Sequence, residues 1–241
     1  MTFEEIMKWL KANGSKEIAE GMKRYAIETK AKVYGHKVGS LRALAKKVGK
    51  DHALALKLFA TDCYEAQILA PMVDDPKLVT KAQMNKWASE FDNWATCDTA
   101  CFVLFDKAEH AWDRARVWAI SKKEFVKRSA FALMASLTIH DKKAEDARYL
   151  DFLPLIEAGA CDERNFVKKS VNWALRSIGK RSLELNAAAL EVALRLKARS
   201  DSPSRWVGSD AARELASPSI QQRLQRKQAK VAAPKKRATK R

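Results

Sequence analysis

The chain has 241 residues, 47% of them hydrophobic, which is enough to bury the core of one large domain or of an extended repeat array. Its formal net charge of +17 favours a polyanionic partner, and the absence of any run of about 18 apolar residues speaks against a membrane-spanning segment. The acidic start, MTFEE, does not resemble a signal peptide. Eight basic residues lie between Arg226 and Arg241, and without them the chain still carries +9.

Helix signals follow one another along the chain. Thr2, with Glu5 three residues later, forms a capping-box pattern that predicts a first helix ending near Gly14, and Ser15 starts the next helix. Gly and Pro are scarce, and no alternating strand of convincing length is present. Further helices are predicted over residues 41–49, 51–58, 80–91, 92–105, 121–137, 162–178 and 182–198.

One heptad occurs twice. The segment 124–130 (EFVKRSA) resembles the segment 165–171 (NFVKKSV), and the two are 41 residues apart. This offset falls within the roughly 40 to 47 residues of HEAT and armadillo units. We therefore expect an all-α fold, a HEAT-like helical-repeat superhelix (a C-shaped α-α solenoid) whose curvature creates a concave face.

The composition changes near residue 200. Residues 1–200 are predicted to form the HEAT-like repeat domain, residues 201–204 read as a linker, and residues 201–228 form a C-terminal helical extension with short helices at 210–215 and 219–228. Residues 229–241 form a basic tail that we expect to be disordered. This tail is either a nucleic-acid-binding arm or a solvated segment that only aids solubility.

No cofactor or metal site is expected. The sequence has neither GxxxxGK[ST] nor GxGxxG, the two glycine-rich patterns that cradle phosphates. It also has no CxxC or HxxxH pair, so its four cysteines are better explained as buried free thiols in a reducing compartment. Those cysteines are Cys63, Cys97, Cys101 and Cys161.

Two constellations of side chains suggest chemistry. Trp94 and Asp98 are four residues apart, so a helix places a carboxylate beside an indole on one face, where the two could stabilise a cation. The alternative is a core tryptophan and an aspartate that serves the helix dipole. At 41 residues apart, Lys127 and Arg128 correspond to Lys168 and Lys169, and stacked repeats would align them in a positive strip.

A second basic row lies on one predicted helix. Lys169, Trp173, Arg176 and Lys180 are spaced at i, i+4, i+7 and i+11, so they share one face. Such a row fits contact with a DNA backbone, although a solvated basic face would show the same pattern.

Three segments resemble the DNA alkylation repair (AlkD-like) glycosylases, HEAT-repeat proteins that excise alkylated bases. They are 91–98 (FDNWATCD), 125–134 (FVKRSAFALM) and 162–176 (DERNFVKKSVNWALR), within a match from about Tyr25 to Trp206. The resemblance implies that Asp98 is the catalytic aspartate and that Trp94 and Trp173 are the active-site tryptophans. It also places DNA-contacting basic positions at Arg128 and Arg176.

The resemblance implies hydrolysis of the N-glycosidic bond of positively charged N3- or N7-alkylated purines in base excision repair. Such a base is already an activated leaving group, so Asp98 would need only to stabilise the oxocarbenium-like sugar and to position water. Two alternatives remain: a non-catalytic DNA-structure-binding protein on the same scaffold, and a protein-interaction solenoid, which the positive charge disfavours. We expect a cytoplasmic, nucleoid-associated monomer whose partner is double-stranded DNA with alkylated bases, with no membrane partner.

Overall fold

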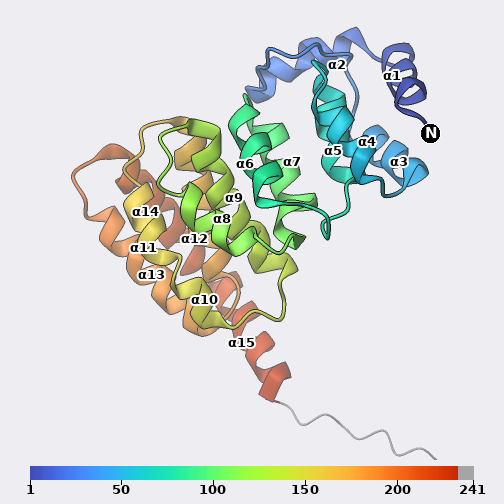
Figure 1. Ribbon diagram of the computed structural model, residues 1–241. Helices are drawn as coiled ribbons and strands as arrows, with labels where there is room; N and C mark the ends of the chain where they lie inside the picture. Colours follow the sequence, from blue (N-terminus) through green and yellow to red (C-terminus); the bar gives the residue numbers. More distant parts are fainter. Residues whose placement is uncertain (233–241) are drawn as a thin grey trace, which may run out of the picture. The chain divides into compact units, whose positions relative to one another are not determined.

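The computed structural model describes residues 1–232, and within this range the secondary structure is helical, without strands. The predicted all-α class is confirmed. The α-helices, labelled in Figure 1, are α1 (Phe3–Ala12), α2 (Lys16–Gly21), α3 (Val38–Val48), α4 (His52–Phe59), α5 (Tyr64–Val73), α6 (Lys81–Glu90), α7 (Trp94–Val103), α8 (Ala111–Trp118), α9 (Glu124–His140), α10 (Asp146–Leu150), α11 (Leu153–Gly159), α12 (Asn165–Gly179), α13 (Leu183–Lys197), α14 (Ser202–Leu215) and α15 (Pro218–Ala232). Two short 3₁₀-helices, η1 (Met22–Tyr25) and η2 (Phe105–Lys107), complete the set.

Capping side chains fix where several helices begin. At each of five predicted starts, the side chain of the residue before the helix accepts a hydrogen bond from a backbone N–H in the first turn, which contributes about 1 kcal/mol per cap. The capping box of Thr2 and Glu5 is complete, with both reciprocal bonds formed. The other four caps are Ser15, Asp51, Thr80 and Ser182.

Helices that the sequence did not indicate are short or buried on several sides. In α5 most residues are buried, including Glu65 and Pro71, so the helix shows little of the one-sided apolar periodicity that marks an amphipathic helix. The helices α8, α10 and α11 have only five to eight residues each, too few to establish a period.

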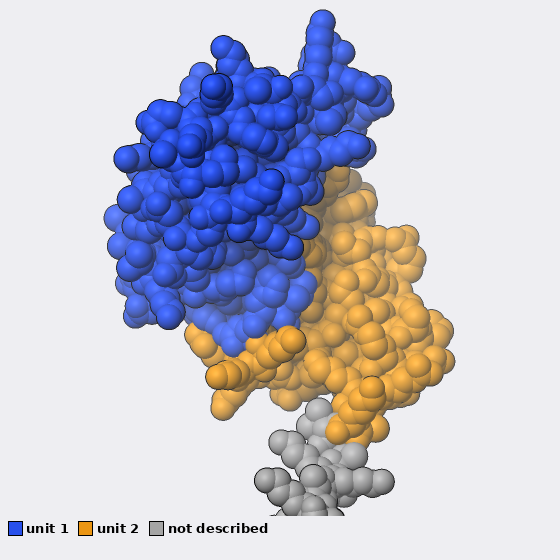
Figure 2. Space-filling view, turned by 90° about the vertical axis from the view of Figure 1, so that its right-hand side faces the viewer, with its two compact units in different colours: residues 1–141 blue, residues 142–241 orange. Residues whose placement is uncertain are grey.

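The chain divides into two compact units, residues 1–141 and residues 142–241, which Figure 2 colours separately. In the first unit, α5 packs on α3, α4 and α7, and α9 packs on α6, α7 and α8. In the second unit, α12, α13 and α14 pack against one another, and α15 packs on α13 and α14. Each unit thus consists of helices packed on helices around its own apolar core.

The repeated heptad occupies equivalent positions in two helices. Its two copies open α9 at Glu124 and α12 at Asn165. The same positions face the core in both copies: Val126 matches Val167 and Ser129 matches Ser170, and all four are buried.

The C-terminal segment is more helical than the sequence suggested. The predicted linker at 201–204 is wrong, because the Asp201 side chain caps α14, which begins at Ser202 and is continuous to Leu215. The predicted tail begins too early, since residues 229–232 belong to α15, and the rest of it lies outside the described residues. Because α14 packs on α12 and α13, it belongs to the same unit as they do, and the division at residue 200 stays a prediction.

A buried carboxylate and a glycine hold the turn that follows the N-terminal helices. Glu65 is fully buried and accepts hydrogen bonds from the backbone N–H groups of Tyr34, at 3.1 Å, and Gly35, at 2.6 Å. Gly35 has a φ of +85°, and a Cβ atom there would lie 2.0 Å from the carbonyl oxygen of Ser15. Only glycine fits this position, because both its backbone conformation and the space around it exclude a side chain.

Gly35→Ala is expected to lower the free energy of unfolding by at least about 2 kcal/mol, through positive φ and steric overlap. Gly39→Ala is the matched control: it lies in α3, has no positive φ, and its Cβ would meet nothing within 4 Å, so it should raise stability by up to about 1 kcal/mol. Urea unfolding monitored by circular dichroism measures both variants. Equal stabilities would contradict the constrained turn.

Candidate functional site

The start of α7 is held by two polar residues that precede it. Asn93 caps the helix, because its side-chain oxygen accepts hydrogen bonds from the N–H groups of Ala95 and Thr96, both at 3.0 Å. The Asp92 carboxylate instead accepts from Thr29 Oγ1, at 2.9 Å, and from the Lys30 N–H, at 2.7 Å. The helix predicted from residue 92 therefore begins two residues later, at Trp94. The hydrogen bonds of Asp92 connect the start of this helix to the segment around Thr29.

Trp94 is the first residue of α7 and is half-buried. Its indole Nε1 donates a hydrogen bond to the Tyr25 carbonyl oxygen at 3.0 Å. Tyr25 itself, at the end of η1, is 70% exposed. Two aromatic residues from segments far apart in the sequence thus lie next to each other at the surface. The indole N–H has a partner within the protein, which fixes the ring.

Small side chains line the contact between α7 and α9. The Cys97 thiol lies 3.2 Å from Ser129 Oγ, and the Cys101 thiol donates to the Ser129 carbonyl oxygen at 3.6 Å. Ser129 Oγ also donates to the Phe125 carbonyl oxygen at 2.8 Å. Side chains of this size let the two helix backbones approach closely. The next residue along α7, Asp98, is thereby brought against α9.

Asp98 and Arg128 form a bidentate ion pair across this contact. Arg128 Nε donates to Asp98 Oδ1 at 2.8 Å, and Arg128 Nη2 donates to Asp98 Oδ2 at 2.6 Å. The Asp98 side chain is 18% exposed and the Arg128 side chain only 8%. The pair fixes the plane of the carboxylate, and each of its oxygens keeps a further lone pair with which to accept a hydrogen bond from water.

Burial and the ion pair act on the pKa of Asp98 in opposite directions. Burial raises the pKa of the carboxyl above its ordinary value of 3.8, and the charge and hydrogen bonds of Arg128 limit that rise. Burial also disfavours the charged guanidinium of Arg128, but the Asp98 charge and hydrogen bonds outweigh it, so the pKa of Arg128 is raised. Because the guanidinium does not deprotonate, its charge favours the ionised form of the Asp98 carboxylate against the effect of burial.

The first unit therefore brings together three of the predicted site residues. Trp94 and Asp98 are one turn apart on α7, which places them on one face of the helix, and Arg128 comes from α9. Lys127, next to Arg128, is half-buried, whereas Arg128 is buried. In the positive strip predicted from the repeat, the two copies differ in burial. Arg128 is buried, whereas Lys169, which occupies the matching position, is exposed.

In the second unit, the basic row on α12 is largely neutralised within the protein. Glu214 of α14 accepts hydrogen bonds from Arg176 Nη1, at 2.6 Å, and from Lys180 Nζ, at 2.7 Å. Arg176 also lies 3.6 Å from Asp210. These pairs join α12 to α14, so a DNA phosphate would have to compete with carboxylates for both side chains. Their predicted DNA contacts stay predictions.

The remaining predicted residues of α12 lie at or near the surface. Trp173 is half-buried, and Lys169 is exposed. The Lys168 ammonium group lies 5.1 Å from the centre of the Trp206 ring, within the range of a cation–π interaction. Trp206 is 40% exposed and was not among the predicted site residues.

Three further residues at these contacts were not predicted from the sequence: Tyr25, Asp92 and Glu214. Each forms a hydrogen bond with a residue distant in the sequence. None lies three or four residues from a predicted site residue, which is the spacing that would have indicated it.

Three of the four cysteine thiols are buried. Cys63, Cys97 and Cys101 are buried and free, as predicted, whereas Cys161 is exposed. Burial raises the pKa of Cys63 to about 11 and that of Cys101 well above its ordinary range, so neither is a reactive thiolate at neutral pH. Among the residues that the structure describes, no three His, Cys, Asp or Glu side chains are grouped so that they could hold a metal ion, and no helix is long and apolar enough to cross a membrane.

The chain is similar to two bacterial proteins of comparable length. Uncharacterized protein Lmo0209 of Listeria monocytogenes is 22% identical over 196 residues, which cover 80% of this chain and 85% of that protein. Uncharacterized protein Lin0241 of Listeria innocua matches at the same identity and coverage. Neither name states an activity.

The fold is similar to that of a solved structure. That structure belongs to a family described as related to the HEAT-like repeat DNA glycosylases and as having affinity for branched DNA structures. The TM-score is 0.72 at 20% sequence identity, and the match covers 89% of this chain and 95% of the other. The predicted HEAT-like repeat fold is therefore confirmed.

A family model described as "DNA alkylation repair enzyme" matches residues 6–215, which include α7, α9 and α12 with their predicted site residues. The segments that suggested this family in the sequence thus lie inside the matched range. The chain belongs to the DNA alkylation repair enzyme family.

Proposed function

We propose that this protein is a DNA N-glycosylase that hydrolyses the N-glycosidic bond of positively charged N3- or N7-alkylated purines. The observation that carries the proposal is the Asp98 carboxylate, fixed by Arg128 and still partly open to solvent one helical turn from Trp94. A carboxylate held in this way can stabilise a cation without first reorganising. Family membership supports the choice of an alkylated base as the substrate.

The reaction follows from the charges involved. The bond between C1′ and the purine nitrogen breaks with both electrons going to the base, which leaves as a neutral molecule. The deoxyribose then carries oxocarbenium-like positive charge, which the negative Asp98 stabilises. Water adds to C1′ and releases one proton to the solvent, and Asp98 accepts a hydrogen bond from that water during the attack.

Aromatic residues would supply the remaining stabilisation. The Trp94 ring is held by its hydrogen bond to Tyr25, so its π-face is available to a cationic sugar or base without loss of side-chain freedom. In the second unit, Trp173 is proposed to contact the lesion in the same way. Lys127, Lys168 and Lys169 are proposed to contact phosphates, because phosphate contacts position a protein on DNA without selecting a sequence.

A second function is supported by the same ion pair. Both oxygens of Asp98 already accept hydrogen bonds from Arg128, which partly neutralises the charge that catalysis would use. The structurally similar protein family is described by its affinity for branched DNA. A DNA-structure-binding protein without glycosylase activity is therefore the alternative. In either case we propose a DNA partner, and hence a location next to the chromosome in the cytoplasm.

Asp98→Asn is expected to lower the rate of base release at least about 100-fold, because the variant loses the charge that stabilises the transition state. Release of 7-methylguanine and 3-methyladenine from methylated DNA under single-turnover conditions measures this, with DNA affinity measured in parallel. Asp113→Asn is the matched control, since it removes one carboxylate charge from an exposed position on α8. DNA binding by the wild type without base release would establish the alternative.

The acidic limb of the base-release rate is expected to have its midpoint above 3.8, the ordinary pKa of an aspartate. The pKa of Asp98 is raised by burial, so the carboxylate becomes protonated, and the rate falls, at a higher pH than for an exposed aspartate. The base-release rate of Asp98→Asn is measured at each pH and subtracted, which removes the contribution of spontaneous depurination. An acidic limb at or below 3.8 would contradict a buried catalytic carboxylate.

Asp98 and Arg128 are expected to be coupled in stability. Removing either partner leaves a buried charge unpaired, so Asp98→Ala and Arg128→Ala should each cost about 3 kcal/mol of unfolding free energy. The double variant should cost at least about 1 kcal/mol less than the sum of the two, as a double-mutant cycle by urea unfolding would measure. Additive effects would mean that the pair does not form in solution.

A further inference from the structure

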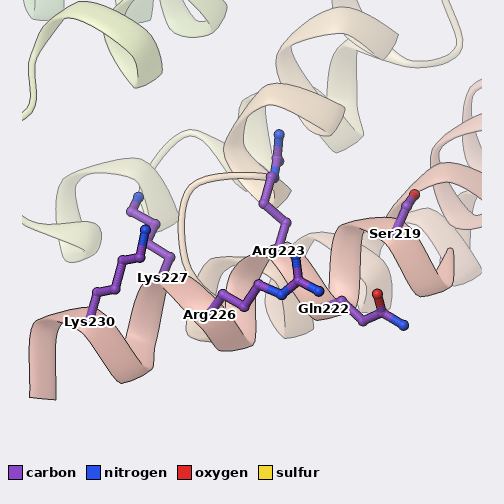
Figure 3. Close-up of a pocket in the computed structure, with 6 residues that line it drawn as sticks. All are labelled: Ser219, Gln222, Arg223, Arg226, Lys227 and Lys230. Carbon is purple, nitrogen blue, oxygen red and sulfur yellow. The ribbon is translucent and has the colours of Figure 1, made fainter. Parts of the chain in front are cut away.

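Helix α15 carries a row of basic side chains along one side. Ser219, Gln222, Arg223, Arg226, Lys227 and Lys230 line a groove of about 550 Å³ in the second unit. Figure 3 shows these side chains distributed over successive turns of the helix. Their spacing of three and four residues keeps them on one face. No acidic residue occurs in α15, so nothing within the helix offsets the four positive charges.

Two sets of contacts hold α15 on the second unit. One comes from the helix face opposite the basic side chains, and the other from hydrogen bonds of two of the basic side chains. Leu224 is buried, and Gln221 Nε2 donates to Asn186 Oδ1 at 2.9 Å and to the Leu215 carbonyl oxygen at 2.8 Å. Arg223 and Lys227 donate to the carbonyl oxygens of residues 180 and 181, just beyond the end of α12. These carbonyls are at the negative end of a helix dipole, which attracts cations. The helix is thus docked on the second unit with its basic face exposed.

Among the residues that the structure describes, Arg226 and Lys230 have no hydrogen-bond acceptor. Elsewhere in the second unit, basic side chains such as Arg176, Lys180 and Arg195 lie in ion pairs with glutamates. Within residues 1–232, neither Arg226 nor Lys230 forms an ion pair or a hydrogen bond with the protein, and both are exposed. Four cations on one helix face, two of them without a partner in residues 1–232, repel one another, and an anion in the groove would relieve that repulsion.

We infer that the groove on α15 is a binding site for the phosphate backbone of DNA, separate from the residues around Asp98. This inference rests on the proposed function, which supplies DNA as the partner. Arginine, lysine, serine and glutamine side chains all contact phosphate oxygens, and such contacts position a protein on DNA without reading its sequence. The contact is therefore independent of sequence and of the alkylated base.

A membrane surface fits the same charge less well. An interfacial helix buries large apolar side chains in the lipid, whereas the groove on α15 is lined by serine, glutamine, arginine and lysine. Leu224 already packs inside the unit, and Ile220 is half-buried. A partner that carries regularly spaced negative charges and requires no apolar insertion matches this face.

The test compares Arg226→Gln/Lys230→Gln with a charge-matched control, Lys142→Gln/Lys143→Gln, which removes two exposed lysines from the same unit. Anisotropy of a labelled, undamaged duplex is measured at several salt concentrations. The α15 variant should weaken binding about tenfold at 0.1 M salt and lower the log–log salt slope by about 1 to 2, since each phosphate contact contributes about 0.9. Because both residues are exposed and form no ion pair within residues 1–232, thermal stability should be unchanged.

The outcomes separate the two proposals. If the wild type binds no DNA, both the proposed function and this inference are wrong. If the wild type binds DNA and the α15 variant behaves as the control does, only this inference is overturned. Binding of the wild type to phosphatidylserine vesicles that is lost in the α15 variant, with DNA binding unchanged, would overturn it in favour of a membrane contact.

Discussion

The ion pair between Asp98 and Arg128 is the constraint on which the proposed chemistry depends. A carboxylate and a guanidinium that are both largely covered must stay together, because separating them would leave an unpaired charge in a poorly solvated place. The pair therefore fixes α7 against α9 as much as it fixes the carboxylate. Its geometry also sets the two opposing effects on Asp98: burial makes the carboxylate a stronger interaction partner for a cation, and Arg128 already satisfies part of that interaction.

The basic side chains of the second unit fall into two groups with different physical roles. Arg176 and Lys180 are paired with Glu214, so most of their charge is used to hold helices together. Arg226 and Lys230 have no such partner within residues 1–232, and their charge is directed to whatever occupies the groove on α15. Net charge alone does not distinguish these groups. The location of acidic residues on neighbouring helices does.

Much of the helical framework could be predicted from local signals. Thr2, Ser15 and Asp51 cap helices where the sequence placed them, since each of these caps requires only two residues three positions apart. The repeated heptad correctly indicated two equivalent helices, because the same core positions recur in both. Helix α5 was missed because it is covered on several sides, and the linker near Asp201 was wrong because its polar residues serve as a cap instead.

The sequence by itself determined the helical class, the family resemblance and the presence of Trp94, Asp98 and Arg128 in family-like segments. Only the tertiary structure decided that Arg128 is buried against Asp98 and that Trp94 donates a hydrogen bond to the Tyr25 carbonyl oxygen. It also decided that Glu214 neutralises part of the basic charge on α12. The reason is physical: a local pattern specifies the face of a helix that a side chain occupies, whereas its charge state and partner depend on residues about 30 to 70 positions away, which packing brings within hydrogen-bond distance.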